Sequence, residues 1–253
     1  GISVLVLLLI LMIQIVLKSK NQNQIVDKIS KNAVPVVVFC GFAVHLLFAN
    51  FGWLIRYEAY FVVVILFAIA PFADELFQNK IGNRLFITFS IRFLPMLKNQ
   101  PIASKNIFDQ QIQLADFLHQ YYRNGKVIAN DIGAITYFNN IHLLDTYGLG
   151  SIEVAKLRKE DHGKFTDNKE LQAYVYNTAR LQDFEVALVF DEWVKMPDYF
   201  TKVGTLTIQN NYMSGGTTVS FYAIKKDHTD KLRNQLAEFS KHTPKDVLIN
   251  IIK

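Results

Sequence analysis

The sequence lacks the residues of several common functional sites. Its only cysteine, Cys40, cannot form a disulfide framework or a cysteine-based metal site. The six histidines show no HxH or HExxH spacing, and no GxGxxG, P-loop or GxSxG pattern occurs. The sequence therefore supports neither a nucleotide-binding domain nor a serine hydrolase, and we expect no cofactor and no metal site.

A dense cluster of lysine and arginine is also missing, although the net charge is +5 and the pI is about 9.1. For a membrane protein, basic residues at the lipid surface explain this charge better than nucleic-acid binding does. We therefore expect the membrane lipid bilayer among the partners of this protein, and no nucleic acid.

Apolar residues are abundant but unevenly placed. They make up 51% of the 253 residues, the mean hydropathy is +0.16, and most of the excess precedes Leu97. This distribution predicts a transmembrane region over residues 1–100 and a soluble domain over 101–253. Because Gly1 opens the chain inside an apolar run, without a Met and a basic leader, we expect the C-terminal part of a longer membrane protein.

Apolar runs predict membrane-spanning helices near residues 2–17, 34–50 and 59–73. The lysine-rich loop at 18–32 is typical of a cytoplasmic loop. The segment 85–97 contains Arg92 and has two interpretations, a fourth crossing or an amphipathic helix on the membrane surface. Four crossings would place the soluble domain outside the cytoplasm, and three would leave it inside.

The turn between the second and third runs contains Arg56, Tyr57 and Glu58. Arginine binds phosphate through a rigid fork of donors, so this turn is a candidate site for a lipid phosphate. The alternative is an interfacial anchor with an Arg–Glu pair. His45 lies within an apolar run, where an ionisable residue is either functional or hydrogen-bonded between helices.

The second half of the chain alternates between helix and strand patterns. Buried strands are expected at 126–131, 141–148 and 185–190, and alternating residues around Gly215 and Gly216 predict a hairpin. Helices are expected between the strands and at 228–241. This order predicts an α/β domain with a mixed sheet.

Asp131 and Asp145 each lie at the end of a predicted strand. Open α/β sheets bind ligands beyond the carboxyl ends of their strands, so these two carboxylates could hold a sugar or a cation. The alternative is structural, with Asp131 capping a helix and Asp145 stabilising a turn.

Four stretches carry a resemblance to a known family: FANFGWLIRYEAY, NIFDQQIQLADFLHQYY, VIANDIGAITYF and LLDTYGLGS. They resemble the C-terminal region of bacterial multi-spanning glycosyltransferases of the GT-C superfamily, which are similar to dolichyl-phosphate-mannose mannosyltransferases. The resemblance implies sugar transfer from a polyprenyl-phosphate donor to an extracytoplasmic acceptor at the bacterial cytoplasmic membrane. It places Arg56 and Tyr57 near the donor phosphate and the catalytic acid upstream of this sequence, so no catalytic residue is named.

Two other functions stay open at this point. One is a membrane-anchored binding or sensory module whose α/β domain holds a ligand at Asp131 and Asp145. The other is a scaffold domain that orders a partner. The sequence does not decide whether the protein is an enzyme.

Overall fold

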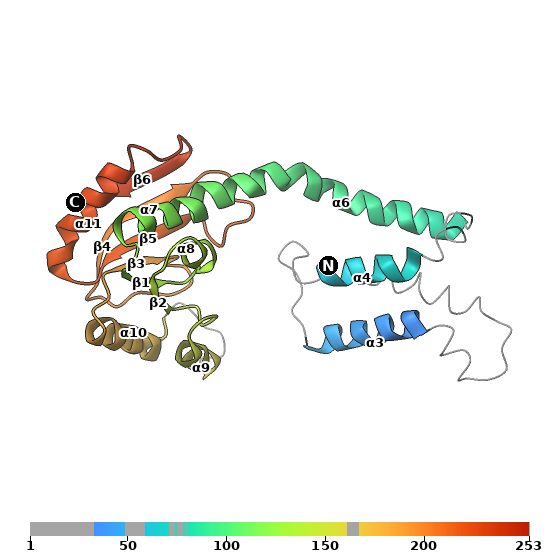
Figure 1. Cartoon of the computed structure of the whole chain (residues 1–253), viewed down its shortest axis with the longest axis horizontal. Coiled ribbons are helices and arrows are strands. Elements are labelled where there is room, and N and C mark those ends of the chain that lie inside the picture. The colour runs from blue at the N-terminus through green and yellow to red at the C-terminus, as the bar shows by residue number, and fades with distance from the viewer. Residues whose placement is uncertain are drawn as a thin grey trace. The chain divides into compact units, whose positions relative to one another are not determined.

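The computed structural model describes residues 33–48, 59–70, 74, 78, 80–160 and 167–252 (Figure 1). The chain divides into two compact units, Gly1–Lys98 and Asn99–Lys253. The expected first span at 2–17, the loop at 18–32 and the Arg56–Tyr57–Glu58 turn lie outside the described residues.

The helices of the first half are too short or too polar for the spans expected there. Helix α3, Ala33–Phe48, has 16 residues and α4, Ala59–Ile69, has 11, whereas a crossing takes about 20 residues. Helix α6, Lys80–Asn106, has 27 residues, but five of them are basic. No helix in the described part of the chain combines the length and apolarity needed to cross a membrane. The membrane part of the expected fold class, with spans at 34–50 and 59–73 and a possible fourth at 85–97, is therefore wrong for the residues that the structure describes.

The second unit contains a mixed sheet of six strands in the order β2-β1-β3-β5-β4-β6. Strand β1 pairs in parallel with β2 and β3, while β5 pairs antiparallel with β3 and β4, and β4 with β6. The parallel strands are short and mostly buried, as expected for strands covered by helices on both faces. The strands are β1 Lys126–Ala129, β2 His142–Asp145, β3 Val186–Val189, β4 Thr201–Ile208, β5 Thr218–Ala223 and β6 Val247–Ile251.

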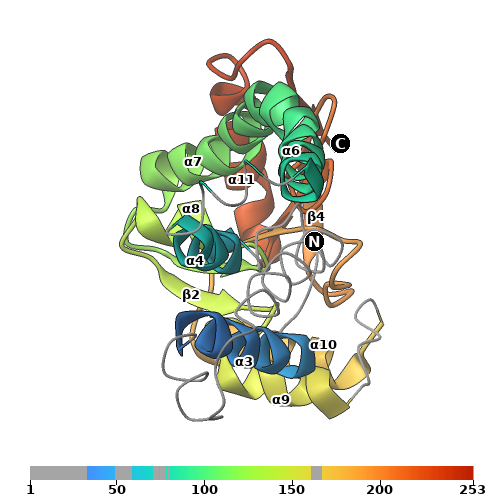
Figure 2. The ribbon, with the colours of Figure 1, turned by 90° about the vertical axis from the view of Figure 1, so that its right-hand side faces the viewer.

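Helices cover the two faces of this sheet (Figure 2). On one face, the rings of Phe117, Phe221 and Phe239 meet at the centre of an apolar core, with centroids 5.1 and 5.3 Å apart. The second core lies on the other face. The first face carries the π-helix η2 Ile107–Ile112, α7 Gln113–Tyr121, α8 Gly133–Tyr137 and α11 Thr229–Phe239, the last preceded by the 3-10 turn η3 Lys226–His228; the second carries α9 Ile152–Glu160 and α10 Lys169–Leu181.

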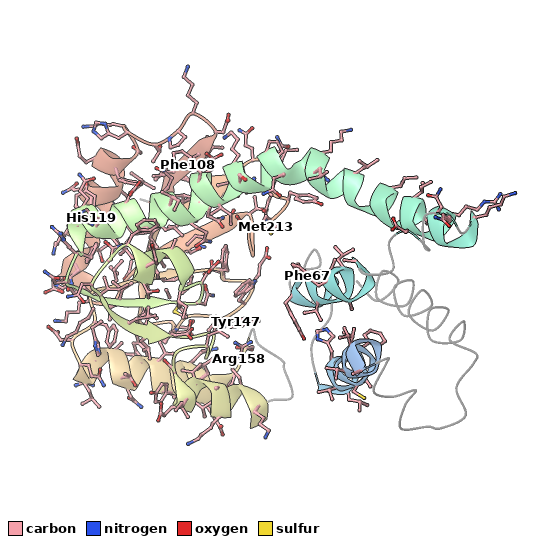
Figure 3. All side chains as sticks on the ribbon, turned by 45° about the vertical axis from the view of Figure 1, so that its right-hand side comes forward. Phe67, Phe108, His119, Tyr147, Arg158 and Met213 are labelled. Atoms are coloured by element: carbon pink, nitrogen blue, oxygen red, sulfur yellow. The ribbon has the colours of Figure 1, made fainter. Side chains whose placement is uncertain are left out.

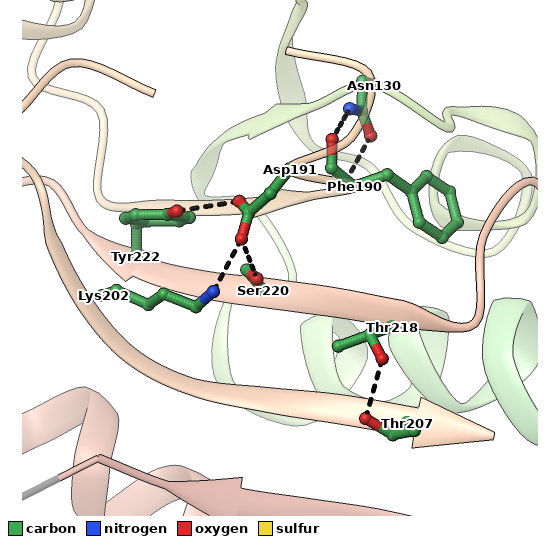
Figure 4. A network of polar contacts seen from close by, with 8 residues as sticks. All are labelled: Asn130, Phe190, Asp191, Lys202, Thr207, Thr218, Ser220 and Tyr222. Atoms are coloured by element: carbon green, nitrogen blue, oxygen red, sulfur yellow. Dashed lines mark hydrogen bonds and ion pairs between the residues drawn. The ribbon is translucent and has the colours of Figure 1, made fainter. Parts of the chain in front are cut away.

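The second face changes character along the sheet. Under α9 and α10 it presents apolar side chains of β1, β2 and β3. On β4 and β5 the same face is polar, because three cross-strand pairs put mainly hydroxyl groups there. The Thr207 and Thr218 hydroxyl oxygens, for example, are 3.0 Å apart (Figure 4). The pairs are Lys202–Tyr222, Thr205–Ser220 and Thr207–Thr218. This polar half of the face adjoins the end of β3.

Candidate functional site

The connections that leave β1 and β3 diverge, which makes their carboxyl ends the natural place for a ligand. After β1 the chain passes through α8 and enters β2, which lies on one side of β1. After β3 it enters the antiparallel strands, which lie on the other side. Ligands of open α/β sheets bind at such a switch point. Here Asn130 joins the two strand ends, because its side chain donates to the Phe190 carbonyl and accepts from the Phe190 N–H, both at 3.0 Å (Figure 4).

Asp145 organises a turn at this edge. Its Oδ1 accepts from the Tyr147 N–H at 2.7 Å and its Oδ2 from the Gly150 N–H at 2.6 Å, and the side chain is buried. Gly148 within the same turn has φ +91°, a backbone conformation that favours glycine. Of the two alternatives considered from the sequence, the structure places Asp145 in the turn.

Asp131 does not act as the expected cap of the following helix. Ile132 occupies the N-cap position of α8, and no side-chain hydrogen bond caps this helix in the described structure. The Oδ2 atom of Asp131 instead accepts from the Nε2 of Gln111, at 2.9 Å. Gln111 belongs to η2, so Asp131 ties the β1 end to the π-helix. The described residues contain no group of three or more His, Cys, Asp or Glu that could hold a metal ion.

A row of aromatic side chains fixes the loop after β3. The ring centroids of Phe190 and Trp193 lie 5.0 Å apart, and those of Trp193 and Tyr147 lie 4.9 Å apart. The Arg158 guanidinium lies 3.8 Å from the centroid of the Tyr147 ring (Figure 3). The hairpin between β4 and β5 approaches this row so closely that a Cβ on Gly215 would lie 2.3 Å from the Trp193 ring. The loop therefore has a defined conformation at its first residues.

Asp191, in that loop, is the centre of the polar network at the switch point. Its Oδ2 accepts from the Lys202 ammonium at 2.6 Å and from the Ser220 hydroxyl at 2.7 Å. Its Oδ1 accepts from the Tyr222 hydroxyl at 2.7 Å (Figure 4). One carboxylate thus connects the end of β3 to both β4 and β5.

The network keeps Asp191 ionised. Burial raises the pKa of Asp191, but the hydrogen bonds from Lys202, Ser220 and Tyr222 oppose it, and the pKa is lowered from its ordinary value. Burial and the neighbouring Asp191 carboxylate raise the pKa of the Tyr222 hydroxyl, which therefore stays protonated as a donor. An ionised carboxylate offers about four acceptor positions, and the three donors leave one for a ligand.

A cavity of about 250 Å³ opens beside this carboxylate. Asp191 and Asp198 supply acceptors, Lys195 supplies donors, and Phe200 supplies an aromatic surface. The hydroxyl proton of Tyr222 is already donated to Asp191, so this oxygen can only accept from a ligand. Met196 and Phe200 are buried in the second core, so part of the lining is fixed by packing. The full lining is Asp191, Lys195, Met196, Pro197, Asp198, Phe200 and Tyr222. Such a mixture suits a small ligand with several hydroxyl groups.

Residues 105–222 match the model of a domain of unknown function, DUF8728. No curated protein and no solved structure matches the chain. The matched span includes Asn130, Asp191, Lys202, Ser220 and Tyr222. The network and the cavity therefore lie within the part of the chain that is similar to this family, whose description states no activity.

The candidates of the first half belong to the other unit of the chain. Arg56, Tyr57 and Glu58 lie outside the described residues. His45 is 4% exposed, and its Nδ1 lies 2.6 Å from the hydroxyl oxygen of Tyr60, a hydrogen bond between α3 and α4. The structure thus places His45 in a contact between helices.

Sequence reasoning missed Asp191, although a signal was present. Asp191 follows directly after a segment predicted as a buried strand, which is the same position that singled out Asp131 and Asp145. Its three donors come from residues 11 to 31 positions further along the chain, and strand pairing alone brings them together.

Proposed function

We propose that residues 99–253 form a saccharide-binding domain whose ligand occupies the cavity beside Asp191. The observation that carries this proposal is the Asp191 carboxylate, which lines the cavity and accepts three hydrogen bonds from the protein. A carboxylate has about four acceptor positions, so one remains for a ligand. Sugars offer hydroxyl donors to such a carboxylate, and their apolar ring faces pack on aromatic surfaces such as that of Phe200.

In the wider reaction, we propose that this saccharide is the acceptor of a sugar-transfer enzyme, with a polyprenyl-phosphate sugar as donor. The support is the resemblance of residues 106–122, 127–138 and 143–151 to the C-terminal region of glycosyltransferases. Arg56 and Tyr57 remain the candidates for the donor phosphate on the same ground. No described residue is proposed as the catalytic acid.

The test is a titration of the full chain with neutral mono- and disaccharides, including mannose, glucose, galactose and N-acetylglucosamine, followed by NMR. We expect at least one of them to bind. Asp191→Asn should then weaken binding about tenfold, because the ligand hydroxyl loses a charge-assisted hydrogen bond. Asp116→Asn is the matched control, since Asp116 is exposed on α7 and lines no part of the cavity.

A second variant separates binding from folding. Asp198 is exposed and lines the cavity, so Asp198→Ala should weaken binding without lowering the melting temperature. The proposal is overturned if no saccharide binds, or if both Asp191→Asn and Asp198→Ala bind as tightly as the unaltered protein.

A further inference from the structure

A second cavity, also of about 250 Å³, shares the lining residue Phe200 with the first. Its walls come from α10, from the loop before β4 and from the residues after β5. Phe200 lines both cavities, so a ligand in the first has a neighbouring space to enter. The lining of the second cavity is Tyr176, Ala179, Arg180, Tyr199, Phe200, Ile224, Lys225 and Lys226.

The charges of the two cavities differ. The first has two carboxylates and one lysine, whereas the second has three cations and no carboxylate among its lining residues. Lys225 forms an ion pair with Asp183. The side chains of Arg180 and Lys226 form no hydrogen bond or ion pair with any residue that the structure describes. Two cations are thus available to a ligand at one cavity.

A structural role accounts for only part of this arrangement. Arg180 lies in the last turn of α10, where a positive charge interacts favourably with the helix dipole. That role requires neither a cavity nor Lys226, which follows β5. Lys225 is held by carboxylates, because Asp183, Asp227 and Glu185 raise its pKa. The side chains of Arg180 and Lys226 have no such partner among the described residues.

Aromatic side chains stand beside these cations. The rings of Tyr176 and Tyr199 have centroids 4.8 Å apart and planes tilted by 32°. Tyr199 is 71% exposed, so one face of its ring is open to a ligand. Aromatic faces of this kind pack against planar or ring-shaped ligands.

We propose that the second cavity binds an anionic substituent, a carboxylate, sulfate or phosphate, carried by a sugar ring that packs on Tyr199. Arg180 and Lys226 supply the charge-assisted donors, and the arginine fork suits an oxyanion. Because Phe200 borders both cavities, the ligand class becomes an acidic saccharide that extends across them. The sugar ring rests on the proposed saccharide-binding function, whereas the contact with the anion does not.

The test compares glucose with glucose 6-phosphate, glucose 6-sulfate and glucuronate, and adds inorganic phosphate, all titrated into the full chain at low ionic strength. The expected result is that at least one anionic sugar binds more tightly than glucose. The double variant Arg180→Gln/Lys226→Gln should weaken that binding, and the binding of phosphate, by about tenfold or more. The control, Lys169→Gln/Lys245→Gln, removes the same charge from exposed residues that line neither cavity and should have no effect.

The aromatic contribution has its own variant. Tyr199→Ala should weaken binding of the anionic sugar and leave binding of inorganic phosphate unchanged. Because Tyr199 is exposed, the substitution should not unfold the protein. The inference is overturned if the double variant binds every probe as the control does, or if no anionic sugar exceeds glucose. A third outcome separates the two proposals. If phosphate binds through Arg180 and Lys226 but no neutral sugar binds, the saccharide-binding function is overturned and the anion site is retained.

Discussion

Asp191 joins three strands through a single carboxylate, at the place where the end of β3 adjoins the polar face of β4 and β5. Its partners are one charged and two neutral donors, all within 2.7 Å. The same contacts that stabilise the fold also hold the carboxylate in the cavity with a fixed orientation. Structure and binding therefore depend on the same residue.

This dual role predicts a pH dependence of stability. Because the pKa of Asp191 in the folded protein lies below its ordinary value of 3.8, its ionised form contributes stability that is fully present above that value. The contribution is lost as the pH falls through the lower, folded-state pKa. The free energy of unfolding should therefore differ between the unaltered protein and Asp191→Asn at pH 7, and the difference should narrow below about pH 4. Urea denaturation at pH 3 to 7 measures it, and a difference that does not change with pH would contradict the prediction.

Asn130 is the second residue on which the site depends. Asn130→Ala leaves the buried N–H and carbonyl of Phe190 without their partner, so the free energy of unfolding should fall by about 2–4 kcal/mol. Asn130→Asp keeps the size and the acceptor but places an oxygen against the Phe190 carbonyl, and should also destabilise. Urea denaturation of both variants at pH 7 is the measurement. A loss below about 0.5 kcal/mol in Asn130→Ala would mean that water replaces the side chain.

At the scale of elements, β6 depends on a close approach to β4. A Cβ on Gly204 would lie 2.7 Å from the Asn250 carbonyl oxygen and 3.1 Å from the Leu236 side chain. Gly204→Ala should therefore push β6 away and lower stability by about 1–3 kcal/mol. Gly133→Ala is the control, because nothing lies within 4 Å of the Cβ it would add. Thermal unfolding compares the two, and equal melting temperatures would show that β6 adjusts without cost.

The elements also show what local sequence patterns can and cannot specify. The buried strands expected at 126–131 and 185–190 are present as β1 and β3, because short apolar runs between helices leave few alternatives. Strand β6 was missed, since Val247–Ile251 is half exposed and is defined by its pairing with β4, some forty positions earlier. The same limit applies to the site. Strand ends indicated Asp131 and Asp145, but only the pairing of β3, β4 and β5 gathers the donors around Asp191.

At the scale of the whole molecule, apolar composition was a poor guide to the described residues of the first half. The apolar runs do form helices, but α3 has 16 residues and α4 has 11. The longer helix α6 contains Lys80, Arg84 and Arg92. The expectation of membrane spans therefore failed for the described residues.

The division of the chain into two units predicts that the second unit folds on its own. Both core clusters of the sheet consist of residues from Leu114 onwards, so the fragment 99–253 contains its complete core. Expressed alone, this fragment should unfold in one cooperative thermal transition with a melting temperature close to that of the same unit in the full chain. A gradual, non-cooperative transition would show that the first unit completes the fold.

The central claim is that a saccharide occupies the cavity beside Asp191, and a crystal structure of the full chain with the tightest-binding saccharide tests it most directly. The account predicts a sugar ring against Phe200, with one hydroxyl about 2.5–3.0 Å from the Asp191 carboxylate, as a fourth hydrogen bond beside those of Lys202, Ser220 and Tyr222. A saccharide bound elsewhere on the chain, with Asp191 contacted by its three protein donors alone, would contradict it.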